Sequence, residues 1–123
     1  MSYAERHSIA VVTAADGSAT AYSPVVTGKV SQIRYVKTDF ATGVDFTITA
    51  EATGETIWTQ TNVDASVTVA PRQATHSTAG AAALYAAGGT GVNDKIALAN
   101  DRVKIVIAAG GDAKTGTFHL IME

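Results

Sequence analysis

The strongest constraint on this chain is a strict alternation of apolar and polar residues between positions 44 and 51. The apolar members are Val44, Phe46, Ile48 and Ala50, and the polar members are Asp45, Thr47, Thr49 and Glu51. Because successive side chains of a β-strand point to opposite faces, this pattern indicates a strand with one buried and one solvated face. A single strand cannot shield its own apolar face, so the segment must belong to a sheet that packs against a second layer.

Turn residues divide the start of the chain into two further strands. Asp16-Gly17 predicts a hairpin between residues 8–13 and 19–26, because glycine tolerates the positive φ of a tight hairpin turn. Pro24 lacks the N–H that a ladder requires, which makes the second strand an edge or interrupted strand.

Residues 29–69 and 103–122, with one more short strand over 92–99, complete the set of strands. The first segment predicts a meander of antiparallel strands, and the second predicts a closing hairpin around the loop 109–114. About eight short strands with turns between them favour an all-β protein, an antiparallel β-sandwich or an open barrel. The predicted core consists of Val44, Phe46, Ile48, Val67, Val69, Val103, Ile105, Ile107, Phe118 and Leu120.

Size and composition fit one such domain. The 123 residues predict a single β domain over 8–123, preceded by an N-terminal arm over 1–7. No cysteine is present, which excludes disulfides and thiolate metal sites within the chain. The net charge is −2 with 16% charged residues and no basic cluster, so we expect no nucleic-acid partner. We also expect no membrane span, because no apolar run reaches about 18 residues.

Residues 71–92 differ from the rest of the chain. Pro71 ends the strand pattern, and a long Gly/Ala-rich excursion follows, in which residues 81–87 could form one or two helical turns. A structureless connection of about 20 residues is long for a small domain, and such loops are usually functional or disordered.

Residues with catalytic or ligand-binding chemistry are scarce. The three histidines, His7, His76 and His119, do not show metal-ligand spacing, and no Gly-x-Ser-x-Gly elbow occurs. Asp45 and Glu51 share a strand face but lie about 20 Å apart along it, which is too far to flank one glycosidic bond. We therefore expect a protein that is not an enzyme and that uses no metal or cofactor.

The glycine-rich stretches and the aromatic residues have structural interpretations. Residues 88–91 and 110–115 lack the spacing of a phosphate-binding loop, so they are expected to be turns. An exposed aromatic platform around Trp58 would indicate carbohydrate binding, whereas a buried Trp58 would belong to the core or an interface. Burial is the expectation, because the aromatic residues are few and scattered.

A small β domain without a chemical site is expected to act through its surface. Two segments suit attachment to a neighbour, the arm 1–7 and the excursion 71–92, whose Ala-Leu-Tyr patch would be unusual in water. In a monomer this patch could cover one end of the sandwich, and in an oligomer, which we favour, it could reach the adjacent subunit. The predicted interface residues are Tyr3, Arg72, Leu84 and Tyr85.

The end of the chain resembles that of a known class of proteins. Residues 101–123 combine a basic-apolar strand, a Gly110-Gly111 loop, the run Lys114-Thr115-Gly116-Thr117 and a final strand. This arrangement resembles the ending of small virion structural proteins of tailed bacteriophages. Residues 69–72 and the Gly-rich excursion up to Val92 fit the same resemblance.

The resemblance implies a β-sandwich or barrel on the capsid or near the neck of a phage particle. The leading hypothesis is a capsid decoration (cement) protein, made in the host cytoplasm and located on the virion surface. Its expected partners are the major capsid protein and further copies of itself, with a trimer favoured. The alternatives are a head–tail or tail ring component and, from another class, a carbohydrate- or cell-surface-binding module.

Overall fold

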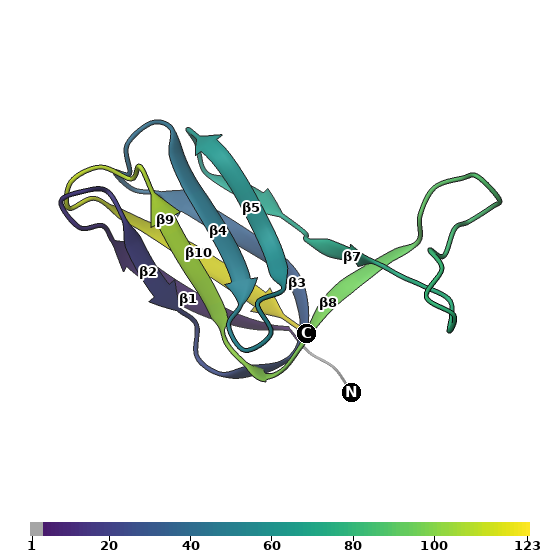
Figure 1. The fold of residues 1–123 in the computed structure, drawn as a ribbon. Helices are drawn as coiled ribbons and strands as arrows, with labels where there is room; N and C mark the ends of the chain where they lie inside the picture. The colour runs from purple at the N-terminus through teal and green to yellow at the C-terminus, as the bar shows by residue number, and fades with distance from the viewer. Residues whose placement is uncertain (1–3) are drawn as a thin grey trace.

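Two antiparallel sheets pack face to face in the computed structural model, which describes residues 4–123 (Figure 1). The larger sheet has the order β1-β10-β3-β8-β7, with β6 also paired to β3, and the smaller has the order β2-β9-β4-β5. The described residues contain no helix, so the predicted all-β class is confirmed, with ten strands in place of about eight. The strands are β1 (Glu5–Val12), β2 (Ala19–Tyr22), β3 (Val26–Lys37), β4 (Val44–Ala50), β5 (Thr56–Val63), β6 (Val67–Val69), β7 (Arg72–Ala74), β8 (Asn93–Asp101), β9 (Val103–Ala108) and β10 (Thr115–Met122).

The core lies between the two sheets and follows the alternation seen in the sequence. The four apolar residues of β4 are buried, and in β10 every second side chain is buried as predicted. Only Val67 and Val69 of the predicted core are half-buried; both lie on the three-residue β6, which pairs with residues 33–35 of β3.

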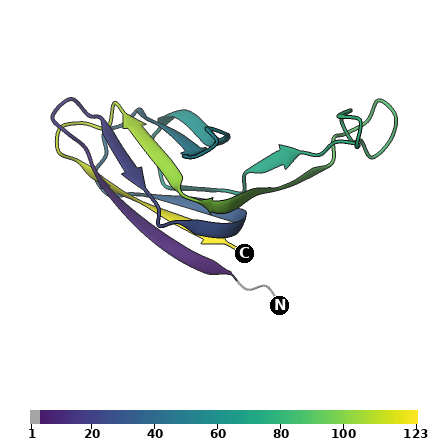
Figure 2. The ribbon, with the colours of Figure 1, turned by 60° about the horizontal axis from the view of Figure 1, so that its bottom comes forward.

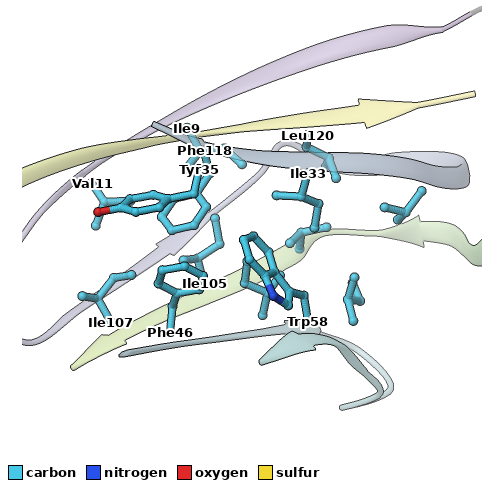
Figure 3. Packing of buried hydrophobic residues seen from close by; sticks show 14 of the residues in the cluster. Ile9, Val11, Ile33, Tyr35, Phe46, Trp58, Ile105, Ile107, Phe118 and Leu120 are labelled. Carbon is cyan, nitrogen blue, oxygen red and sulfur yellow. The ribbon is translucent and has the colours of Figure 1, made fainter. Parts of the chain in front are cut away.

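Aromatic side chains fill the centre of this core (Figure 3). The ring centroid of Phe46 lies 5.1 Å from that of Tyr35, 5.2 Å from that of Phe118 and 4.8 Å from that of Trp58. The two sheets supply rings to the same cluster, since Tyr35 and Phe118 come from the larger sheet and Phe46 and Trp58 from the smaller. Edge-to-face and tilted aromatic pairs of this kind add specific stability to the burial of apolar area.

The two hairpins predicted around Asp16-Gly17 and around the loop 109–114 are wrong. β1 pairs with β10 and β2 with β9, so each turn carries the chain from one sheet to the other. The two turns bind each other. The Gly110 N–H donates to the Gly17 carbonyl at 2.9 Å, and the Thr13 hydroxyl donates to the Gly111 carbonyl at 2.6 Å. These contacts close one end of the sandwich in place of two local hairpins.

The meander predicted over 29–69 is correct only for β4 and β5, which form an antiparallel hairpin. β3 and β4 lie in opposite sheets, and β6 crosses back to pair with β3. Phe40 lies in the β3–β4 connection and is buried, so this crossing contributes a side chain to the core.

Residues 5–7, which were predicted to lie in an N-terminal arm, belong to the sandwich. β1 begins at Glu5, and residues 5–7 pair with residues 122–120 of β10, so they belong to the sheet. Residues 1–3 lie outside the described residues, and Tyr3 is among them.

The hydroxyl of Tyr35 is buried and has no hydrogen-bond partner among residues 4–123. We expect Tyr35→Phe to raise the free energy of unfolding by about 1 kcal/mol, because an unpaired buried polar group is removed. Burial raises the pKa of this phenol. Ionisation is therefore easier in the unfolded chain, and the native protein should lose stability as the pH rises above the ordinary tyrosine pKa of about 10.

Urea unfolding of both proteins between neutral and alkaline pH tests this expectation. The Tyr35→Phe protein should lose less stability than the native protein over the alkaline range. As a control, Tyr85→Phe, at an exposed position, should leave the free energy of unfolding and its pH dependence unchanged. A less stable Tyr35→Phe protein at neutral pH would show that the hydroxyl is satisfied in the native state.

Candidate interaction arm

A two-stranded ribbon extends away from the sandwich and is the most unusual feature of the molecule (Figures 1 and 2). It consists of β7 and the first residues of β8, which pair from Arg72↔Lys95 to Ala74↔Asn93. From Ile96 onward β8 leaves β7 and pairs with β3 in the sandwich. We call residues 72–95 the arm and residues 75–92 the tip.

Charged side chains fix the base of the arm to the sandwich. Arg72 Nη1 donates to the Ser31 carbonyl at 3.0 Å. Ser31 lies on β3 between the residues that pair with β8 and those that pair with β6, so this hydrogen bond joins the base of the arm directly to β3. An ion pair of 3.7 Å joins Lys29 to Asp94.

Glu123 also contacts the base of the arm. Lys95 and Glu123 form an ion pair, and the backbones of Lys29 and Glu123 exchange two hydrogen bonds of 2.9 Å. The base is therefore fixed by contacts from β3, β8 and the chain end, and the direction of the arm is set by the sandwich.

The tip is held by its own backbone hydrogen bonds. Thr75 N–H donates to the Val92 carbonyl, Val92 N–H to the Ala83 carbonyl and Ala83 N–H to the Thr75 carbonyl, at 2.9–3.0 Å. Two small loops, closed by the bridges His76↔Ala82 and Leu84↔Gly91, extend from this ring of three bonds.

No helical turn forms over residues 81–87, so that prediction is wrong. Alanine favours helix, but both ends of this run are turns in which Gly80 and Gly88 have positive φ. The backbone N–H groups of Ala83 and Tyr85 donate to the carbonyls of Thr75 and Thr90, so they are not available for the hydrogen bonds of a helix.

The surface of the tip is uncharged and partly apolar. No Asp, Glu, Lys or Arg occurs between Arg72 and Asp94. Leu84 is 43% exposed and Tyr85 77% exposed, and the other residues around them are mainly alanine, glycine, serine and threonine. Large exposed apolar side chains at the end of a projection are typical of an interaction surface.

The four predicted interface residues therefore have different positions. The structure brings Leu84 and Tyr85 together at the tip, whereas Arg72 lies at the base, where it anchors the arm. Tyr3 is outside the described residues. Sequence reasoning missed Lys29, Lys95 and Glu123, because their pairing joins segments that are distant in the chain.

The other candidate residues have structural roles. Trp58 is 8% exposed, and its indole N–H donates to Gln60 Oε1 at 3.1 Å, so it forms no exposed platform. Asp45 Oδ1 accepts the Asn62 N–H at 2.8 Å where β5 is bulged. Glu51 accepts two hydrogen bonds from Arg102 at 2.7 and 2.8 Å, and these bonds lower the pKa of its carboxyl group.

Within residues 4–123 no three His, Cys, Asp or Glu side chains gather where they could hold a metal ion. The same residues include no helix of the length and apolarity needed to cross a membrane. No family model, no curated protein and no solved structure matches the chain. What the protein does must therefore be inferred from its own geometry.

Proposed function

We propose that this protein decorates the outer shell of a tailed-phage capsid and stabilises it through protein–protein contacts. The observation that carries the proposal is the arm, which holds an uncharged, partly apolar tip away from a well-packed β-sandwich. The resemblance of residues 101–123 to virion proteins supports the choice of particle. In this proposal the chain is made in the host cytoplasm, binds the major capsid protein and resides on the virion surface.

The mechanism is mechanical. An arm whose base is fixed by Arg72 and whose tip is internally hydrogen-bonded loses little conformational entropy on docking, so more of the contact energy remains as affinity. Contacts from one molecule to several shell subunits act together, and each must be lost before the shell opens. Bound copies therefore oppose the internal pressure of packaged DNA.

A head–tail or tail ring component is the second candidate. A projection from each subunit that reaches its neighbour also suits a closed ring. The carbohydrate-binding alternative has no comparable support, because the aromatic platform that it requires around Trp58 is absent from the described surface.

Binding to empty shells of the cognate major capsid protein tests the proposal. We expect the native chain to sediment with the shells and a variant in which a two-residue turn replaces residues 75–92 to bind at least about tenfold more weakly, since the loss of a central apolar contact commonly exceeds 1.4 kcal/mol.

A matched control replaces the exposed turn residue Thr53 with alanine and should bind like the native chain. The thermal midpoint of the shortened variant should stay close to the native value, because the tip lies outside the core. Equal binding by native and shortened chains would remove the arm from the interface.

A further inference from the structure

The first strand of the larger sheet has an edge without a partner among residues 4–123. β1 lies at one end of the order β1-β10-β3-β8-β7 and pairs only with β10. Figure 2 shows it, in purple, as the outermost strand of its sheet. Such an edge presents a row of backbone N–H and C=O groups, to which another chain can add a strand.

The other edges of the sandwich are short or irregular. β2 has four residues and is closely followed by Pro24, β6 and β7 have three residues each, and the pairing of β5 with β4 shifts register twice. β1 instead pairs with β10 over all eight of its residues without a shift, and it contains neither proline nor glycine. Short strands, prolines and bulges discourage strand addition, so β1 is the edge that remains suited to it.

The register of β1 shows which of its backbone groups point to the open edge. The Thr13 N–H donates to the Lys114 carbonyl at 2.9 Å, and this pair continues the β1–β10 register by one residue. Because hydrogen-bonded and non-hydrogen-bonded pairs alternate along an antiparallel ladder, the odd-numbered residues of β1 bond to β10. The residues that direct their N–H and C=O groups to the open edge are therefore Arg6, Ser8, Ala10 and Val12.

We infer that this edge pairs with the same edge of a second copy of the chain, antiparallel and about a two-fold axis at Ile9. Arg6 then lies opposite Val12 of the partner copy and Ser8 opposite its Ala10, so every outward-directed residue forms a hydrogen-bonded pair. A two-fold axis at Ser8 would leave Val12 outside the paired strands, and one at Ala10 would leave Arg6 outside. The edge is thus complementary to itself, as a two-fold dimer requires.

The side chains brought together in this register are compatible. Val12 is 63% exposed, more than any other valine, leucine or isoleucine of residues 4–123, and the methylene stem of Arg6 from the partner copy can cover it. The two turns next to Val12 carry Asp16 and Asp112 against the single cation Lys114. The guanidinium of the partner copy therefore meets a net negative charge.

The charges of β1 lie at one end of the strand. Arg6 faces Val12 of the partner copy, and Glu5, on the opposite face, has its Oε2 3.6 Å from His7 Nε2. The neighbouring strand β10 contains no Asp, Glu, Lys or Arg. The centre of the paired segment, from Ser8 to Ala10, is therefore free of charge, and no like charges lie directly opposite each other.

Pairing through β1 leaves the arm free. β1 and β7 lie at opposite ends of the larger sheet, so the second copy adds to the side away from the arm (Figure 1). Each dimer then holds two tips outward, and these can bind separate subunits of a shell. The dimer does not depend on the proposed function, because it is measured without any shell.

Light scattering on a sizing column measures the dimer. We expect the native chain at twice its 12.6 kDa mass. Ala10→Pro removes an N–H that points to the partner copy and makes no bond to β10, so the variant should fold and its dimer dissociation constant should rise at least about fivefold. The matched control, Ala10→Val, changes the same exposed side chain but keeps the N–H, and it should dimerise like the native chain.

A charge swap tests the register. Val12→Lys places a lysine opposite Arg6 at both ends of the dimer, and we expect the affinity to fall about two- to thirtyfold. Adding Arg6→Glu to this variant makes both pairs opposite in charge and should restore the dimer. The control is Val106→Lys, at an exposed position of the smaller sheet, which should leave the dimer affinity unchanged.

A native chain that stays monomeric up to the highest concentration measured, a proline variant that dimerises like the native chain, or a charge swap without restoration would each overturn the inference. A trimer, which the resemblance implies, would overturn it too, because a two-fold contact closes at two copies.

Thermal midpoints show whether the variants are folded, and Ser8→Pro replaces Ala10→Pro if the latter is not. The charge swap leaves the backbone unchanged, so it decides the question if neither proline variant folds. A dimer that fails to bind shells would count against the proposed function alone.

Discussion

Replacement of Phe46 by alanine is expected to lower the free energy of unfolding by about 3–5 kcal/mol. The ring is 1% exposed and lies at the centre of the aromatic cluster, in contact range of Tyr35, Trp58 and Phe118. Its removal leaves a cavity bordered by strands of both sheets, and hydrogen-bonded sheets cannot collapse freely to fill it. Urea unfolding followed by tryptophan fluorescence measures the loss, with Trp58 as a reporter beside the cavity.

The matched control is Thr47→Ala, one residue further along the same strand with its side chain exposed. It should change stability by no more than about 0.5 kcal/mol. A loss below about 1 kcal/mol for Phe46→Ala would show that the cluster repacks and that the core is not centred on this ring.

Replacement of Gly116 by valine is expected to cost about 1–3 kcal/mol through overpacking. A Cβ added at Gly116 would stand 2.5 Å from Cε2 of Phe40, far inside contact distance. Phe40 is buried and its ring is stacked on Tyr35 at a centroid distance of 6.1 Å, so it cannot move aside without disturbing the core. Denaturant unfolding measures the change.

Two further variants make this prediction specific. Gly91→Ala should be nearly neutral, since its Cβ would meet only Asn93 Oδ1 at 3.9 Å. Trimming the clashing ring with Phe40→Leu should cost less in the Gly116→Val background than in the native chain, which a double-mutant cycle detects. Additive losses would mean that the two residues are not in contact.

The strands and their faces were predictable because they depend on local alternation. The buried sets of β4, β9 and β10 were identified from the period of two alone. Strand partners were not predictable in the same way. A turn sequence such as Asp16-Gly17 indicates that the chain reverses direction. It does not indicate whether the next strand joins the same sheet or the opposite one. That choice depends on contacts such as Gly110 with Gly17, which join residues far apart in the chain.

The candidate interaction arm was likewise predictable only in part. An alanine- and glycine-rich excursion that contains a leucine and a tyrosine was visible in the sequence, and Leu84 and Tyr85 were predicted from it as interface residues. Their exposure is seen only in the structure. The shape of this excursion could not be predicted from the sequence. The ribbon forms because β8 pairs with β7 up to Lys95 and with β3 from Ile96 onward. The exposure of Tyr22 and Val25 was missed for a similar reason. Pro24 indicated an interrupted strand, but only the fold shows that the side chains beside it stay exposed.

The central claim is that this chain covers a shell by surface contacts made through its arm. Cryo-electron microscopy of particles assembled with the native chain, compared with particles assembled with the variant that lacks residues 75–92, tests this most directly. The account predicts density for the β-sandwich repeated over the whole shell with the native chain, and its loss with the variant. Density confined to a single ring at the neck or tail, or equal decoration by the variant, would contradict it.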